Sequence, residues 1–189
     1  MLSEERIIEI FKEAKALNEG HFLLTSGKHS NQYIQCAQVL RFPNYTEELG
    51  KELGDRFKGQ VDIVIGPAMG GIIVAYEVAR ALGVEAIFTE RQQGEMLLRR
   101  GFNITPGQRV LVVEDVITTG GSVQEVINIV KTMGGQVIGV GVLVDRSGGR
   151  ADFGVQLESL LQLNIPTYEP ENCPLCATGS KPIKPGSRN

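Results

Sequence analysis

The segment Arg109–Ser122 constrains the fold of this chain most, because it joins a fully apolar strand to a glycine-rich turn. The run Val110–Val113 is unbroken and apolar, as a strand buried on both faces requires. Glu114 and Asp115 follow where that strand is expected to end, and residues 118–122 read Thr-Thr-Gly-Gly-Ser before a helical pattern. A strand, a tight turn and a helix in this order predict a βα unit in a parallel sheet.

The turn has more polar groups than a simple connection needs. Its glycines let successive N–H groups point into one concavity, and the following helix adds the positive end of its dipole, so the loop suits a phosphate. The carboxylates just upstream, Glu114 and Asp115, suit sugar hydroxyls or a Mg²⁺ ion. A phosphate site beside such a pair predicts a phosphorylated sugar as the ligand.

This segment resembles the phosphoribosyl-pyrophosphate (PRPP) signature of the type I phosphoribosyltransferases at nearly every position. The resemblance implies that the acidic pair contacts the ribose hydroxyls during catalysis and that the loop encloses the 5′-phosphate. It also implies a Mg²⁺ ion held mainly by ligand oxygens near Asp115. The PRPP-binding residues implied in this way are Glu114, Asp115, Val116, Ile117, Thr118, Thr119, Gly120, Gly121 and Ser122.

The remaining periodicity predicts an α/β fold. An amphipathic helix is expected over residues 3–18, capped by Ser3 and ended by Gly20, with short strands between residues 22 and 40. A further helix is expected to start at Pro43. Beyond it, apolar strands alternate with helices, which implies right-handed crossovers and a parallel sheet covered on both faces. The expected strands are 61–65, 85–89, 109–114 and 137–144, and the expected helices are 71–82 and 122–133.

The 189 residues are expected to form a single domain, 1–189. The resemblance implies a parallel-sheet type I phosphoribosyltransferase core over 43–149 and a small hood subdomain from 1–42 and 150–180, and residues 180–189 are expected to be a flexible tail. A net charge of −3 gives no general attraction to nucleic acid, and no apolar run approaches the roughly 18–20 residues of a membrane span. Three cysteines and no secretory pattern at the N-terminus predict a cytoplasmic protein without a disulfide framework.

A second glycine-rich turn, Ile65–Gly71, joins an expected strand to an expected helix. On its own it fits an ordinary βα turn equally well. In type I phosphoribosyltransferases a pyrophosphate-binding loop follows this strand, often with a cis peptide. The resemblance therefore implies a pyrophosphate loop at Ala68, Met69 and Gly70, with the cis peptide near Ala68–Met69.

Two features indicate which base the site accepts. The segment Phe22–Tyr33 resembles the N-terminal signature of orotate phosphoribosyltransferases, F-x-L-x-S-G-x-x-S-x-x-Y, although a surface hairpin is the simpler interpretation. Arg146 ends the last expected strand, where an arginine of orotate enzymes contacts the base; a surface pair with Asp145 is the alternative. A guanidinium binds a carboxylate such as that of orotate bidentately. The implied orotate-binding residues are Thr118, Arg146, Lys28 and Tyr33.

The chain departs from the best-known bacterial orotate enzymes at three places. Lysines of those enzymes correspond to Thr25 and Gly70 here, and their mobile loop carries lysines and a histidine that the insertion 90–107 lacks. Pyrophosphate still needs cations, and the insertion offers Arg91, Arg99 and Arg100, of which we expect Arg91 to be catalytic. The insertion is long and polar, which is typical of a lid rather than a packed element.

The histidines and cysteines have no expected role in catalysis. His21 and His29 stand alone in the sequence, with no metal-ligating partner at a useful spacing. Cys173 and Cys176 form a C-x-x-C motif, which can be half of a zinc site, but only Cys36 remains to extend it. Two chains together offer a Cys₄ set, whereas one chain is expected to keep these thiols free.

The resemblance as a whole implies the reaction orotate + PRPP → orotidine 5′-monophosphate + pyrophosphate, in de novo pyrimidine biosynthesis. It implies Mg²⁺ as cofactor and a homodimer whose mobile loop is shared across the interface. Two alternatives remain at this point. A phosphoribosyltransferase for another base, such as a purine, needs the PRPP loop but not Arg146. A nonenzymatic PRPP-sensing regulator that binds nucleic acid needs a basic face or an added DNA-binding domain, and a single domain with a net charge of −3 favours neither.

Overall fold

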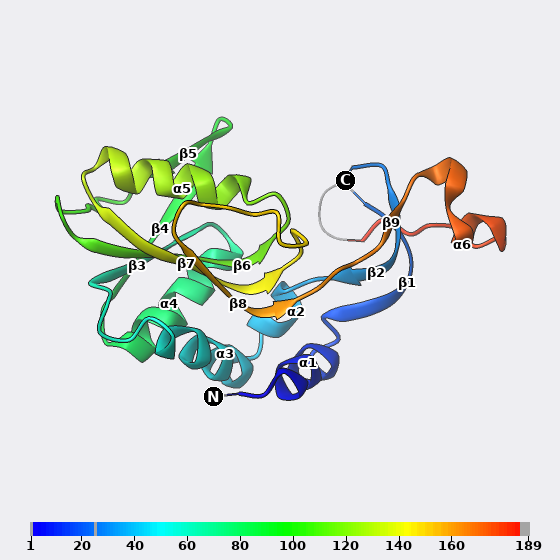
Figure 1. Cartoon of the computed structure of the whole chain (residues 1–189), viewed down its shortest axis with the longest axis horizontal. Coiled ribbons are helices and arrows are strands. Elements are labelled where there is room, and N and C mark those ends of the chain that lie inside the picture. The colour runs from blue at the N-terminus through cyan, green and yellow to red at the C-terminus, as the bar shows by residue number, and fades with distance from the viewer. Residues whose placement is uncertain (1, 25, 186–189) are drawn as a thin grey trace.

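The computed structural model describes residues 2–24 and 26–185, and it contains two sheets (Figure 1). The large sheet has six strands in the order β5-β4-β3-β6-β7-β8, and the small sheet has the order β1-β2-β9. The strands are β1 (Leu17–Leu23), β2 (His29–Ile34), β3 (Ile63–Pro67), β4 (Glu85–Gln92), β5 (Glu95–Leu98), β6 (Arg109–Ile117), β7 (Gln136–Asp145), β8 (Gln156–Gln162) and β9 (Thr167–Tyr168). The helices are α1 (Glu4–Glu13), α2 (Ala37–Leu40), α3 (Pro43–Asp55), α4 (Gly70–Leu82), α5 (Gly121–Thr132), a 3₁₀ turn η1 (Pro170–Asn172) and α6 (Pro174–Ala177).

The large sheet is parallel except for β5, which pairs antiparallel with β4. From the adjacent strands β3 and β6, the chain builds outward to β4 on one side and to β7 and β8 on the other. At the carboxyl edge of the sheet, the chain therefore continues from β3 and from β6 into helices on opposite faces. Ligands of open α/β sheets bind in the crevice at such a point of reversal. The α/β fold with a parallel sheet that the sequence predicts is confirmed.

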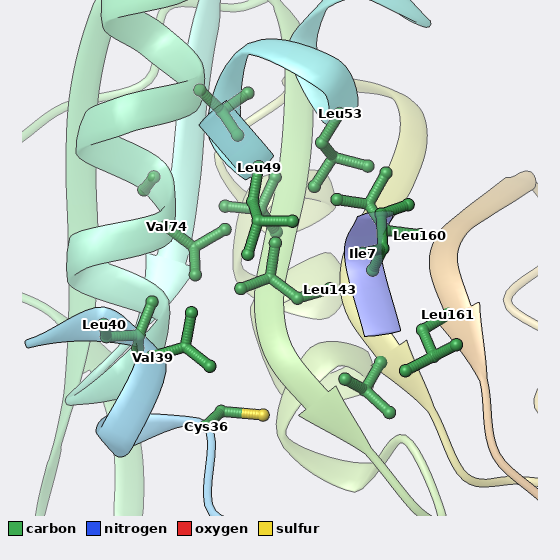
Figure 2. Packing of buried hydrophobic residues seen from close by; sticks show 14 of the residues in the cluster. Ile7, Cys36, Val39, Leu40, Leu49, Leu53, Val74, Leu143, Leu160 and Leu161 are labelled. Carbon is green, nitrogen blue, oxygen red and sulfur yellow. The ribbon is translucent and has the colours of Figure 1, made fainter. Parts of the chain in front are cut away.

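Helices cover both faces of the large sheet, with α5 on one face and α3 and α4 on the other (Figure 1). Figure 2 shows Leu49 and Leu53 of α3 and Leu143 of β7 gathered in the core between these layers. All three side chains are at most 1% exposed. Full burial of each contributes roughly 1.5–3 kcal/mol, so this layer provides the rigid base on which the loops at the carboxyl edge rest.

The first helix ends earlier than its sequence pattern predicts. The helix expected over residues 3–18 stops at Glu13, although Ser3 does cap it and accepts a hydrogen bond from the Arg6 N–H. Lys15 takes a left-handed conformation with φ of 53°, and the Lys15 and Ala16 N–H groups donate back to the carbonyls of Lys12 and Phe11. This pair of bonds is the Schellman helix end, which usually requires a glycine. With lysine in that position the sequence gives no stop signal, and the expected one, Gly20, lies inside β1.

The insertion after β4 contains a packed element. Residues 90–92 extend β4, Gln93 and Gly94 turn the chain with φ of 51° and 91°, and β5 returns antiparallel along β4. Two left-handed turn residues are what a tight hairpin needs. Beyond the turn, the side chains of Met96, Leu98 and Phe102 pack against the core. The expectation that the whole insertion lacks a packed element is therefore wrong.

The end of the chain also holds structure that its sequence pattern did not indicate. Strand β8 lies after Gly149, where no strand was expected, and pairs parallel with β7. Further on, Ile183 accepts a hydrogen bond from the Leu23 N–H at 2.9 Å and donates one to the His21 carbonyl at 2.8 Å. Residues 186–189 of the expected tail, like Thr25, lie outside the described residues.

Candidate active site

The two adjacent carboxylates lie within β6, which continues past them to Ile117 rather than ending at Glu114. The Glu114 carboxylate accepts the Asp115 N–H at 3.0 Å, and Asp115 accepts the Val116 N–H at 2.8 Å. Both side chains are half-buried, and the described residues supply no ion-pair partner for either. Burial and the neighbouring charge of Asp115 raise the pKa of Glu114, and burial raises the pKa of Asp115. The pair therefore suits a ligand that supplies a cation or hydroxyl donors.

The loop after β3 packs directly on this acidic pair. The Ala68–Met69 peptide is cis, at the position that the sequence resemblance implies. A Cβ atom at Gly70 would lie 2.3 Å from Asp115 Oδ2, so a larger residue would require the carboxylate to move. The loops that follow β3 and β6 are thus in contact at the carboxyl edge of the sheet.

The loop after β6 has the geometry of an anion site. Gly120 precedes α5 with φ of 76°, and a Cβ there would lie 2.7 Å from the Phe153 ring, so glycine is required. The first N–H groups of α5 have no acceptors within the helix and face the loop opening with the positive end of the helix dipole. A cavity of about 290 Å³ lies here, lined by Arg91, Glu114, residues 116–123 and Glu125. Its size and donors suit a phosphate group.

A second cavity, of about 860 Å³, adjoins the first. Val116, Thr118 and Thr119 line both cavities, so a ligand can extend from one to the other. Tyr33 and Arg146 also line the larger cavity, which brings three of the four expected base-binding residues together.

Arg146 stands out because its charge is unmatched. Its Nε atom is buried without a hydrogen-bond partner, and no carboxylate among residues 2–24 and 26–185 forms an ion pair with it. The surface pair with Asp145 does not form, because Asp145 is buried and accepts the Ser147 N–H at 2.7 Å. Burial lowers the pKa of the guanidinium. A carboxylate ligand in the cavity would supply the partner that the described residues do not provide.

Other expected site residues have partners within the protein. Lys28 Nζ lies 2.7 Å from Glu169 and does not line the cavity. In the insertion, Arg99 and Arg100 both pair with Glu90. Arg91 pairs with Glu125 at the rim of the phosphate cavity. Of the three arginines, Arg91 is thus the one beside the anion site.

The structure adds polar residues to the larger cavity that the sequence did not single out. Arg150, Asn164 and Lys184 line it from the C-terminal part of the chain. Arg150 directly follows the glycine pair after the last expected strand, and this position was the signal that could have indicated a role in the site. Lys184 is placed by the hydrogen bonds of Ile183 to β1, a long-range contact with no local pattern.

Comparison with known proteins gives a consistent result. A family model for the phosphoribosyl transferase domain matches residues 41–153. The chain is 62% identical over 188 residues to an orotate phosphoribosyltransferase of Desulforamulus reducens, covering 99% of this chain and 98% of that protein. It is 58% identical, covering 99% of both, to one of Caldanaerobacter subterraneus subsp. tengcongensis. A crystal structure of orotate phosphoribosyltransferase from Aeropyrum pernix superposes with a TM-score of 0.72 at 29% identity, covering 83% of this chain and 93% of that one.

Proposed function

This chain belongs to the orotate phosphoribosyltransferases of the phosphoribosyltransferase family, and we propose how its residues share the transfer of a 5-phosphoribosyl group from PRPP to orotate. The unpaired Arg146 guanidinium in the cavity beside the phosphate loop carries the proposal. Among the described residues, the Arg146 Nε atom is buried without a hydrogen-bond partner, and orotate differs from uracil by a carboxylate that a guanidinium can bind.

The phosphoribosyl part of PRPP occupies the loop after β6. Thr118–Ser122 and the first turn of α5 bind the 5′-phosphate, and Glu114 and Asp115 bind the ribose hydroxyls. The pyrophosphate lies over Ala68, Met69 and Gly70, where the two loops meet. Arg91, at the rim of the 5′-phosphate cavity, answers the charge that develops on the leaving pyrophosphate.

Transfer requires a base nitrogen to attack C1′ of the ribose as pyrophosphate leaves, through an oxocarbenium-like state. Arg146 and Tyr33 hold the base in the larger cavity, and the phosphate loop holds the ribose next to it. Catalysis then consists of positioning, charge neutralisation and exclusion of water, without a covalent enzyme intermediate.

We propose Mg²⁺ as the cofactor, bound mainly through ligand oxygens beside Asp115. The half-buried acidic pair without a cationic partner fits such an ion, because burial and mutual repulsion both favour added positive charge there. When bound, Mg²⁺ supplies positive charge that stabilises the departing pyrophosphate.

The exposed apolar side chains of α4 support a homodimer. Ile73 and Tyr76 of α4 and the N-cap residue Met69 are 42%, 63% and 82% exposed, and their spacing of four and three residues places them on one face. We propose that a second copy covers this face and that the β4–β5 hairpin is shared with the neighbouring site.

Among the described residues, no helix is long and apolar enough to cross a bilayer. We propose a cytoplasmic location.

A base panel tests the function. The protein is incubated with PRPP, Mg²⁺ and one base at a time, and pyrophosphate release is measured with orotate, uracil, adenine or hypoxanthine. We expect release with orotate and none after chelation of Mg²⁺. Preference for adenine or hypoxanthine would contradict the assignment of Arg146 as the specificity residue.

A further inference from the structure

Four potential metal ligands meet outside the active site, between the small sheet and the C-terminal segment. They are His21 of β1, His29 of β2, Cys173 just before α6 and Cys176 within α6. One ligand atom from each residue lies within 4.8 Å of the others, and all but Cys176 are buried. The sequence-based expectation that the two histidines stand alone is therefore wrong. Cys173 and Cys176 are free thiols. The two histidines of the same chain complete a group of four potential ligands with them.

The distances fit a tetrahedral ion. His21 Nε2 lies 3.0 Å from His29 Nδ1, 3.6 Å from Cys173 Sγ and 3.8 Å from Cys176 Sγ, which is itself 3.3 Å from His29 Nδ1. Bonds of about 2.0–2.1 Å to nitrogen and about 2.3 Å to sulfur give tetrahedral edges of roughly 3.3–3.8 Å. Of these four distances only the nitrogen–nitrogen one lies below that range, and the other two pairs lie within 4.8 Å, so small movements of a ring and a thiol would admit the ion.

The surroundings orient the ligands as a metal site requires. His21 Nδ1 lies 3.1 Å from the Ser180 carbonyl oxygen, and an N–H that donates to this oxygen leaves the lone pair of Nε2 facing the cluster. The backbone folds around the cysteines in a tight turn, because Ala177 N–H donates to the Cys173 carbonyl and Ser180 N–H to that of Leu175. The segment that carries the two thiols therefore also carries the Ser180 carbonyl, which orients His21.

We propose that His21, His29, Cys173 and Cys176 form a structural zinc site that ties β1 and β2 to the C-terminal segment. Two neutral imidazoles and two thiolates around Zn²⁺ give no net charge, which suits a buried position, and binding releases the two thiol protons. Nitrogen and sulfur ligands select zinc over Mg²⁺, which prefers oxygen. The site is thus chemically distinct from the one beside Asp115, and the proposal is independent of the function proposed above.

The location indicates what the ion would stabilise. The small sheet has only three strands, and β9 consists of two residues, which is too little to hold this arrangement by itself. His29 pairs with Tyr168 of β9, and the neighbouring Ser30 hydroxyl donates to the Pro166 carbonyl at 2.8 Å. Pro166 and Thr167 line the larger cavity together with Tyr33. An ion at the cluster would therefore fix one wall of the base-binding cavity.

The first test measures metal in the wild-type protein. The reduced, folded protein is purified without chelators, its metal content is measured by plasma mass spectrometry, and Co²⁺ is exchanged into the site. We expect one zinc per chain, visible bands of tetrahedral cobalt and a near-ultraviolet thiolate-to-cobalt band. Reduced, folded protein that neither carries zinc nor takes up Zn²⁺ or Co²⁺ would overturn the proposal, and the cluster would then be a hydrogen-bonded group.

The second test removes ligands. Cys173→Ser and Cys176→Ser are each expected to lose the zinc, while Cys36→Ser, which removes the third thiol, keeps it. A strong zinc chelator should lower the Tm of the wild type by several degrees and leave the Tm of folded serine variants unchanged. Serine variants that retain stoichiometric zinc, or a wild-type Tm that does not respond when the zinc is removed, would contradict the site or its structural role, respectively.

Discussion

Side chains of both charge signs line the site, and some of them form no ion pair with another described residue. Arg146 has no carboxylate, and Glu114 and Asp115 have no cation, among the described residues. The groups lie at neighbouring parts of one crevice, and their burial raises the pKa of both acids and lowers that of the arginine. A substrate carboxylate and a bound cation would each neutralise one of these buried charges. Removing each charge by substitution therefore tests its role.

Arg146→Ala is expected to raise the KM for orotate roughly 10- to 100-fold, because a hydrogen bond to a charged group is worth about 1.5–3 kcal/mol. The KM for PRPP should change little, and the preference for orotate over uracil should narrow. Steady-state kinetics with both bases measure this, with Arg80→Ala, an arginine paired with Glu47 and Glu77 on the surface of α4, as the matched control. An unchanged KM for orotate would contradict the role of Arg146.

Asp115→Asn is expected to lower turnover with PRPP by roughly a hundredfold, since the carboxylate offers two charged acceptors to the sugar and the ion. The change leaves no cavity and removes a carboxylate whose pKa burial raises, so the Tm without ligand should not fall. Turnover and Tm are compared with those of Asp55→Asn, which removes an exposed carboxylate paired with Lys51 at the end of α3. A variant with near-normal turnover would show that the ribose hydroxyls bind elsewhere.

The raised pKa of Glu114 also predicts how stability depends on pH. Between its usual value of 4.5 and about 9, this carboxyl binds more protons folded than unfolded, so the free energy of unfolding falls as pH rises through that range. Glu114→Gln is expected to flatten this decline in the ligand-free protein. Urea unfolding at several pH values measures it. If the two proteins show parallel curves from about pH 6 to 9, Glu114 is ionised in the folded chain throughout.

At the scale of elements, the β4–β5 hairpin packs against the core and also places a cation at the active site. It is packed through Met96 and Leu98, yet it holds Arg91 at the rim of the phosphate cavity in an ion pair with Glu125. Both partners of this pair are exposed, so the pair contributes little stability and can open at small cost. Arg91 can therefore exchange Glu125 for a ligand while the strands stay paired.

Arg91→Ala is expected to lower kcat and leave orotate binding nearly intact, because the charge that Arg91 answers develops on the departing pyrophosphate. Hydrogen exchange in residues 90–98 should slow most with PRPP, Mg²⁺ and a base analogue together. Glu125→Gln, which keeps the arginine but removes its partner, serves as the control and should retain more turnover than Arg91→Ala. Equal kcat in Arg91→Ala and the wild type would assign the pyrophosphate's cation to another residue.

The elements that the sequence predicts well are those with local signals. Val110–Val113 reads as a buried strand, and Gly120 marks a turn that only glycine allows. Strand β8 was missed because it is an edge strand in which only Leu160 and Leu161 are buried, so its pattern is too weak to distinguish from a loop. The end of α1 was misplaced because a lysine occupies a position where the usual signal is glycine.

The parts of the site that depend on long-range contacts could not be predicted. Lys28 was expected at the base, but Glu169, 141 positions away, pairs with it. His21 and Cys173 meet although they are 152 positions apart. Neither contact has a local pattern, since both depend on how the chain returns to the small sheet.

At the scale of the whole molecule, the exposed face of α4 predicts the oligomeric state. Tyr76→Glu is expected to convert a dimer to a monomer, because a charge at Tyr76 opposes burial of that face against a second copy. Light scattering after size-exclusion chromatography measures the mass, with Lys58→Glu, at an exposed position beyond α3, as the control. A wild-type protein that is already monomeric at micromolar concentration would contradict the proposed dimer.

The contact between Gly70 and Asp115 links the evolutionary histories of two loops. A side chain at position 70 is sterically admissible only after the carboxylate at position 115 has rotated away, so the effect of either change depends on the other. Such dependence means that the effect of a substitution at position 70 is set by how far the Asp115 carboxylate can move, and that it changes when the residue at position 115 changes.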